Sequence, residues 1–260
     1  MMTKPIIPNT TVRSKYRKDL ERLSSFVVAE TEKEVARYLR GEAAKEFYTG
    51  DASASSQLRI GFSKLFKFLD KVIKEKSKLY ANRMVSRTDK ESSYSLNKSV
   101  EGLTFKPAVG TDEFKSLVSA NVDLITSMNG NYLENIKGVM ERSIQQGGLE
   151  FSEKQIKASL TKEALKIKNK AKNVALDQTR KANSSLTQVK MTRSGIKRFQ
   201  WIHSGGGQNP RSLHKNVLNG KIFDLDNPPV IDRKTGERGL PAQAINCKCI
   251  MRPIYEPETA

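Results

Sequence analysis

Both histidines and both cysteines of the chain, residue types that often bind transition metals, fall within 47 of its 260 residues. They are His203, His214, Cys247 and Cys249. Two imidazoles and two thiolates suit tetrahedral zinc, whose borderline-soft charge accepts both kinds of donor. Zinc-binding cysteine pairs usually leave two residues between them, whereas Cys247 and Cys249 are separated by one. The pattern predicts a zinc site, and it leaves open two buried structural thiols or a strained disulfide.

A second constellation in the same region has the residue types of a phosphodiesterase. Arg211 could stabilise phosphate charge, and His214 could act as a general base. Asp224, Asp226 and Asp232 could then supply oxygen ligands for a hard metal. The chain has no Walker-type phosphate loop, no His-Glu-x-x-His and no Gly-x-Ser-x-Gly motif. We therefore expect a protein that binds rather than catalyses, with a metal-dependent nuclease or toxin-like enzyme on this module as the alternative.

Positive charge is distributed unevenly along the sequence. The chain carries 46 Lys and Arg against 28 Asp and Glu, a net charge of +18. Residues 153–200 contain 13 basic and 3 acidic residues, which is more than half of that net charge. Such a segment predicts contact with the phosphates of double-stranded DNA without recognition of base sequence. The densest phosphate contacts are expected at Lys166, Lys168, Lys170, Lys172, Arg180 and Lys181.

The apolar residues ahead of the His/Cys region recur with the 3.6-residue period of amphipathic helices. They predict long helices over about 11–47, 58–84, 118–144 and 164–189, with a break in the third at Asn129-Gly130-Asn131. The helical period vanishes near Phe199, and six of the nine prolines follow. The sequence therefore predicts a mainly α fold of long amphipathic helices, followed by a small, loop-rich C-terminal α+β module with Trp201 in its core.

These changes in composition divide the chain into three regions. Residues 1–110 are expected to form a helical docking region, 111–198 a basic helical region, and 199–260 the α+β module with Arg-x-x-His and Cys-x-Cys. No stretch approaches eighteen consecutive apolar residues, so we expect no membrane span. The first twenty residues have no long apolar run and no small-residue cleavage site, so we expect no signal peptide.

A series of small motifs runs through the second half of the chain. It begins with Ala175-Leu-Asp-Gln178-Thr-Arg-Lys181-Ala-Asn183, Gly195-Ile and Trp201. It continues with Arg211-Ser-Leu-His214 and Asn219-Gly220-Lys-Ile-Phe223. It ends with Gly236, Gly239, Pro241, Asn246-Cys247-Lys-Cys249 and Pro253. Over roughly residues 115–255 this ordered series resembles the phage head morphogenesis family, the Mu F-like minor head proteins. It departs from the family in having Lys248 in place of arginine and no Asp between Trp201 and His214.

The resemblance implies a structural protein of a tailed bacteriophage, located inside the head of the virion and in the host cytoplasm during assembly. Its implied partners are the portal protein, a capsid or scaffolding protein, and packaged double-stranded DNA. The implied role is to support head assembly, DNA packaging or ejection, with no catalysis expected. From the residues alone, a zinc-dependent nucleic-acid-binding regulator is a further alternative.

Overall fold

The computed structural model describes residues 3–40, 52–145, 153–205 and 210–256. The chain forms two compact units, each built from segments that are distant in sequence. The first unit combines Met1–Tyr16, Ala81–Ser119 and Asn173–Ala260. The second unit combines Arg17–Tyr80 and Ala120–Lys172.

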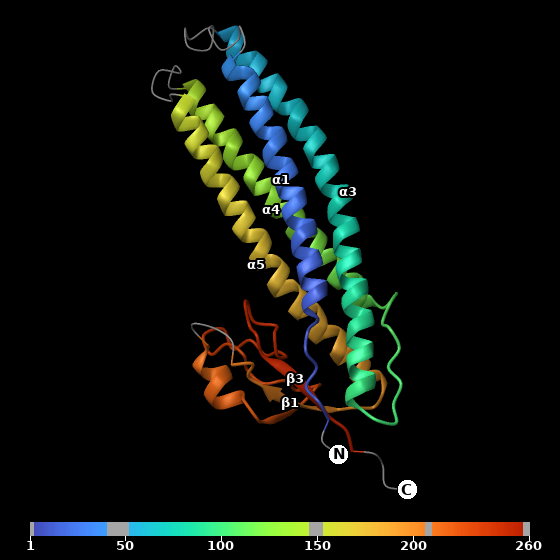
Figure 1. Cartoon of the computed structure of the whole chain (residues 1–260). Coiled ribbons are helices and arrows are strands. Elements are labelled where there is room, and N and C mark those ends of the chain that lie inside the picture. The colour runs from blue at the N-terminus through green and yellow to red at the C-terminus, as the bar shows by residue number, and fades with distance from the viewer. Residues whose placement is uncertain (1–2, 41–51, 146–152, 206–209, 257–260) are drawn as a thin grey trace. The chain divides into compact units, whose positions relative to one another are not determined.

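Long helices account for most of the described residues (Figure 1). They are α1 (Thr10–Arg40), α3 (Ala52–Ser99), α4 (Asp112–Gln145) and α5 (Glu153–Arg193). In α1 the buried Tyr16, Leu20, Leu23 and Val27 recur every three or four positions, the spacing that keeps one helical face on a core. The prediction of a mainly α fold with long helices is confirmed. None of the helices in the described ranges is long and apolar enough to cross a membrane.

The second unit is a helical bundle made from segments of α1, α3, α4 and α5. Phe26 of α1 packs edge to face on Phe68 of α3, with ring centroids 6.4 Å apart. The side-chain amide of Asn135 in α4 donates to Glu163 Oε2 of α5 at 2.9 Å. The buried apolar side chains of this unit include Leu20, Leu23, Val27, Leu69, Ile73, Ile125, Ile136, Met140 and Ile167.

The predicted break in the third helix is wrong, because α4 runs unbroken through Asn129. The Asn129 side chain is buried and its amide donates to the Ile125 carbonyl at 2.9 Å, one turn back in the same helix. Its Oδ1 accepts a hydrogen bond from the Ser24 hydroxyl of α1 at 3.3 Å. The polar side chain therefore bonds along and between helices instead of competing with the helical backbone.

A small antiparallel sheet confirms the predicted C-terminal α+β module. It consists of β1 (Arg198–Ile202), β2 (Ile222–Asp224) and β3 (Ile250–Ile254) in the order β2-β1-β3. Trp201 of β1 lies opposite Met251 of β3. Because side chains alternate between the faces of a strand, Phe199 and Trp201 share one face, and both are fully buried as core residues. A short π-helix, η1 (Leu213–Leu218), lies between β1 and β2.

The C-terminal module shares its core with segments from the start and the middle of the chain. Ile6, Leu96, Phe105 and Met191 belong to the same buried apolar cluster as Trp201. The Ile6 amide also donates to the Met251 carbonyl at 2.8 Å, which attaches the N-terminal segment to β3. The compact units consequently do not follow the sequence divisions at residues 110 and 198, since contacts between distant segments define them.

A buried ion pair joins α3 and α5 inside the first unit. Lys190 Nζ lies 2.7 Å from Asp89 Oδ1, and the side chains are 1% and 0% exposed. Lys190 also donates to the Asp89 carbonyl and to the Ser92 hydroxyl. Both carboxylate oxygens of Asp89 accept from the Ala108 amide, at 3.0 and 2.9 Å. The pair therefore fixes the segment after α3 as well as the two helices.

Candidate functional site

His214 is held in the core of the first unit by η1 and by the sheet. Its side chain is buried and packs edge to face on Trp201, with ring centroids 5.1 Å apart. Its Nε2 lies 2.9 Å from the Ile231 carbonyl, which can only accept, so Nε2 carries a proton. In the neutral ring the lone pair is then on Nδ1, the nitrogen that faces the two cysteines. A π-helical turn is rare and is often found at functional sites.

The cysteines reach His214 because the loop before β3 takes an unusual backbone path. Ala242 and Asn246 have positive φ angles of 73° and 57°, a conformation that asparagine tolerates but alanine rarely adopts. The Asn246 amide donates to Asp177 Oδ1 of α5 at 2.7 Å. Cys247 and Cys249 are both buried and both free thiols, so the disulfide alternative is not realised.

The donor atoms of the three residues lie close to one another. His214 Nδ1 lies 3.4 Å from Cys247 Sγ and 3.9 Å from Cys249 Sγ. Tetrahedral zinc with ordinary Zn–N and Zn–S bonds separates these atoms by about 3.6 Å. The donor atoms of all three residues lie within 4.8 Å of one another, so the cluster could hold a metal ion. The bond from Nε2–H to a backbone carbonyl is also the usual support of a metal-binding histidine.

Contacts within the cluster shift the proton affinities of its members. The Cys249 thiol donates to Cys247, and this bond together with His214 outweighs burial and lowers the pKa of Cys247 to about 4. The same shared proton, together with burial, raises the pKa of Cys249 well above its ordinary value. Burial lowers the pKa of His214, but hydrogen bonds to Cys247 and the Ile231 carbonyl outweigh it and raise that pKa overall. These shifts favour the thiolate form of Cys247, which is the form that binds metals.

A further polar group is directed at the cluster. Trp201 Nε1 is buried without an oxygen or nitrogen partner among the described residues. The indole N–H acts on the Cys249 sulfur and lowers its pKa, although the larger effects raise it. A thiolate sulfur at Cys249 would accept this N–H more strongly than a thiol does, so the indole favours negative charge on that sulfur.

The structure does not bring His203, the fourth predicted ligand, into the cluster. The His203 amide donates to Asn219 Oδ1 at 2.8 Å, and its Nδ1 accepts from the Gly205 amide at 3.2 Å. The backbone at the end of β1 therefore sets its position. Within the described ranges, the gathered donor set is His214, Cys247 and Cys249, which leaves the fourth position of a tetrahedral ion to another ligand.

The residues of the phosphodiesterase interpretation do not form a site of their own. Arg211 Nη2 donates to the Ile245 carbonyl at 3.0 Å and so fastens the start of η1 to the loop that carries the cysteines. Asp232 accepts from the Lys234 amide at 2.8 Å, which closes a turn. Asp224 and Asp226 belong to no cluster of metal-binding side chains in the part of the chain that the structure describes.

The predicted phosphate contacts on α5 fall into two groups. Their first four members, Lys166, Lys168, Lys170 and Lys172, lie in the second unit and are exposed. The last two lie in the first unit and are half-buried: Lys181 pairs with Asp177 at 2.9 Å, and Arg180 has a buried Nη1. Lys168, Lys170 and Lys172 form no ion pair with any described residue, and of these three only Lys168 lines a groove.

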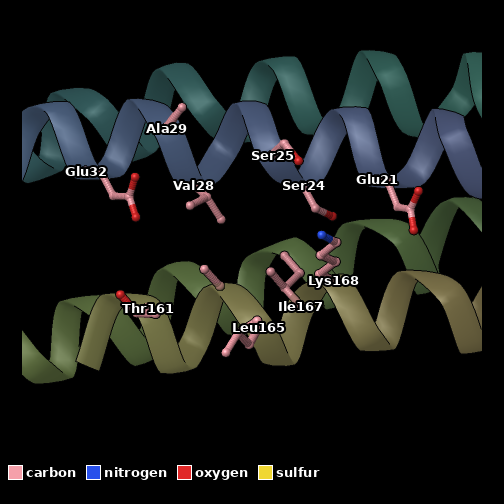
Figure 2. Close-up of a pocket in the computed structure, with 11 residues that line it drawn as sticks. Glu21, Ser24, Ser25, Val28, Ala29, Glu32, Thr161, Leu165, Ile167 and Lys168 are labelled. Carbon is pink, nitrogen blue, oxygen red and sulfur yellow. The ribbon is translucent and has the colours of Figure 1, made fainter. Parts of the chain in front are cut away.

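Lys166 and Lys168 are both exposed but differ in their surroundings. Lys166 Nζ lies 2.5 Å from Glu163 one turn earlier. Lys168 lines a groove of about 280 Å³ between α1 and α5 in the second unit. Figure 2 shows its ammonium directed across this groove toward Ser24, with Glu21 on the same wall. Lys166 is therefore less available for DNA than Lys170 and Lys172, whereas Lys168 faces the groove without an ion pair to a described residue.

Several groups that shape the site lie outside the sequence prediction. The Ile231 carbonyl and the amides of Ala242 and Cys249, which bond to the donors, belong to the backbone and have no signature in residue type. The sequence indicates Asp177 only as part of the first motif of the series. In the structure its carboxylate accepts from the Asn246 amide and so fixes the loop that carries the cysteines.

Comparison with known proteins gives one distant relative. A Haemophilus influenzae protein described as uncharacterized is 23% identical over 266 residues, covering 97% of this chain. The alignment covers 55% of that protein, so the chain spans about half the length of the curated relative it matches. No family model matches the chain, and no solved structure matches it.

Proposed function

We propose that this chain is a minor head protein of a tailed bacteriophage, which associates with the portal and contacts packaged DNA inside the head. The observation that carries the proposal is the placement of the motif series that resembles the head morphogenesis family. Trp201, His214, Cys247 and Cys249 are far apart in sequence and pack as one buried cluster. Such mutual contacts are expected if the motif residues form one structural module that the members of the family share.

Other members of the motif series connect separate parts of this module. Asp177, from the first motif, binds the amide of Asn246 in the last. Asn219 accepts from the His203 amide, and Gly220, with φ of 81°, donates its amide to the Trp201 carbonyl at 2.8 Å. These roles are structural, which favours a protein that works by binding rather than by catalysis.

The exposed lysines of α5 support contact with DNA. Lys170 and Lys172 present ammonium groups that no described carboxylate neutralises, as sequence-independent binding to phosphates requires. The net charge of +18 favours approach to any polyanion, including DNA packed inside a head. The binding we propose is therefore to the DNA backbone and not to its bases.

Exposed apolar side chains support docking of the 1–110 region on the portal or capsid. Phe26 and Phe68 are in contact with each other but remain 38% and 51% exposed. Adjacent exposed aromatic rings often mark protein–protein interfaces. We assign the portal as the partner because the family that the motif series resembles associates with it.

Co-expression with the portal protein of the same phage genome tests the proposal. A tag on the portal should retain the wild-type chain through size-exclusion chromatography. The Phe26→Ser, Phe68→Ser double variant should be retained at least about tenfold less, because hot-spot aromatics each contribute about 2 kcal/mol or more to binding. Ile222→Ser, which removes a 49% exposed side chain of β2, should be retained like the wild type. Failure of the wild-type chain to bind portal, capsid or scaffolding protein would contradict the proposal.

We propose that the His214, Cys247 and Cys249 cluster binds a zinc ion with a structural role. The donor types, their spacing and the Trp201 N–H that acts on the Cys249 sulfur all fit a site with two thiolates. A small module with much irregular backbone also gains stability from a metal that joins η1 to the loop before β3. Metal analysis by mass spectrometry should find about one zinc per chain. Zinc should be lost in Cys247→Ser, Cys249→Ser and kept in His203→Ala.

A metal-dependent nuclease or toxin-like enzyme is the second candidate, because three protein donors leave a fourth position for a reactive water. Burial of all three donors opposes it, since a scissile phosphate would have to reach the ion. Plasmid cleavage by the zinc-loaded wild type, abolished in His214→Ala, would favour this candidate over the head protein.

A further inference from the structure

A basic cleft lies in the first unit, and it shares no lining residue with the groove of Figure 2. Its volume of about 580 Å³ is within the range that small organic ligands occupy. The walls come from the segment before α1, the first turn of α1, the middle of α5, the end of β1 and the start of β3. The lining residues used below are Ile7, Arg13, Arg180, His203, Lys248 and Ile250.

The charges that line this cleft are all positive. Arg13, Arg180 and Lys248 supply three cations, and none of the described lining residues is acidic. The nearby carboxylate of Asp177 is already bound by Lys181 at 2.9 Å and by the Asn246 amide at 2.7 Å. Neither Arg13 nor Lys248 forms an ion pair with a described residue. Cys247 and Asp177 place negative charge near Arg180, but no described lining residue is acidic, so the lining itself carries an excess of positive charge.

Arg180 has a donor that lacks an acceptor. Its Nη1 is buried and forms no hydrogen bond with the described residues. Buried donors are nearly always paired, so an orphaned guanidinium N–H beside a cleft indicates an acceptor that binds there. Burial, and then the neighbouring positive charge of Arg13, lower the pKa of Arg180. A bound anion would relieve both of these costs.

The first turn of α1 adds to the positive potential of the cleft. The 31-residue helix begins at Thr10, which lines the cleft, and has no acidic residue in its first turn. The positive end of the helix dipole thus acts on the cleft without local neutralisation. Asn9 Oδ1 caps the amides of Thr11 and Val12, at 2.8 and 3.2 Å, which fixes the direction of this turn.

The rest of the lining is suited to an organic body. Ile7 and Ile250 offer apolar surface, and His203 adds a polar ring. Because His203 Nδ1 accepts from the Gly205 amide, its neutral ring carries the proton on Nε2, which can donate. The cleft therefore combines a positively charged part with an apolar part, and the His203 ring could stack on a flat organic ligand.

We propose that this cleft binds a phosphate monoester on an organic body of about nucleotide size, with the phosphoryl oxygens on Arg13, Arg180 and Lys248. Three cations match the charge of a phosphate monoester, about −1.5 to −2 at neutral pH, better than that of a single carboxylate. Arginine also suits a phosphate because its planar fork donates two parallel hydrogen bonds. This site is distinct from the exposed lysines of α5 and does not depend on the head-protein proposal. A free nucleotide and the 5′-phosphate of a DNA end share this chemistry.

Calorimetric titration in a buffer free of phosphate and sulfate tests the site. Adenosine 5′-monophosphate should bind the full-length protein, and adenosine should bind at least about tenfold more weakly, because it lacks the phosphoryl group that accepts charge-assisted hydrogen bonds. Arg13→Gln and Arg180→Gln should each weaken nucleotide binding by at least about tenfold. Arg233→Gln, which removes an exposed arginine outside the cleft, should leave it unchanged. Lys248→Gln gives a second measurement if Arg180→Gln lowers the thermal midpoint.

Competition identifies the source of the phosphate. If a 5′-phosphorylated DNA duplex displaces the nucleotide and the same duplex with a 5′-hydroxyl does not, the ligand of the cleft is a DNA end. Nucleotide binding that neither duplex affects indicates a free nucleotide, and both results support the site. The proposed site would be overturned if nucleotide and nucleoside bound equally well. It would also be overturned if phosphate-dependent binding survived Arg13→Gln and Lys248→Gln. Absence of binding by adenosine monophosphate and inorganic phosphate at millimolar concentration would overturn it as well.

Discussion

Neutralising Lys170 and Lys172 should weaken DNA binding by an amount that follows from their exposure. Both ammonium groups are exposed and unpaired within the described residues, so each can replace one condensed counterion on the duplex. The slope of log affinity against log salt should then fall in magnitude by about 0.9 for each lysine, or about 1.8 for Lys170→Gln, Lys172→Gln. At 0.1 M salt, taken against a 1 M reference, this corresponds to an affinity loss of about 60-fold.

Fluorescence anisotropy of a labelled duplex over a range of salt concentrations measures both quantities. The matched control is Arg233→Gln, Lys234→Gln, which removes the same net charge from an exposed turn of the first unit. Lys181→Gln should change the slope little, because Lys181 is half-buried and paired with Asp177. Two duplexes of unrelated sequence should give the same result. An unchanged slope in the Lys170, Lys172 variant, or an equal loss in the charge-matched control, would refute the assignment of these contacts.

Three further predictions concern stability. Lys190→Met should lower the free energy of unfolding by about 3–5 kcal/mol in denaturant titration, because it leaves the buried Asp89 carboxylate without its cation; a loss below about 1 kcal/mol would contradict this. The hydrogen bond from Lys166, and then that from Asn135, lower the pKa of Glu163 below its ordinary value of 4.5. The stability that Glu163 contributes is thus present above that value and lost as pH falls through its lowered pKa. In thermal melts at decreasing pH, the midpoint of Glu163→Gln should therefore fall less than that of the wild type. An unchanged pH dependence in the variant would argue against this role. A zinc chelator should lower the thermal midpoint of the wild type but not that of Cys247→Ser, Cys249→Ser, and equal shifts in both would count against the metal.

Local pattern was enough to predict the helices but not the two units. The apolar repeat of α1 predicts its buried face because helix geometry fixes which residues share a side. The break predicted at Asn129 is wrong because its side chain bonds to the Ile125 carbonyl in its own helix and to Ser24 of α1 across a buried helix contact. The units depend on pairings such as that of Ile6 with Met251, which join residues from opposite ends of the chain and leave no local pattern.

The candidate site was predictable in residue type but not in geometry. Residue type alone does not distinguish His203 from His214 as a metal ligand. The π-helical turn η1 brings His214 to the cysteines. The positive φ of Ala242 also has no signal in its residue type, since alanine rarely adopts that conformation. Charge density located the basic segment of α5, but it did not show that Lys181 is paired while Lys170 is not.

Mass spectrometry of assembled heads tests most directly whether this chain is a minor head protein. Portal, capsid and scaffolding proteins of the same phage genome would be co-expressed with the chain, and the particles treated with protease and nuclease before analysis. The chain should be recovered from intact particles in a few copies per portal, protected from protease, and its recovery should fall in the Phe26→Ser, Phe68→Ser variant. Absence from particles that assemble normally, or presence only as a protease-sensitive contaminant, would contradict the proposal.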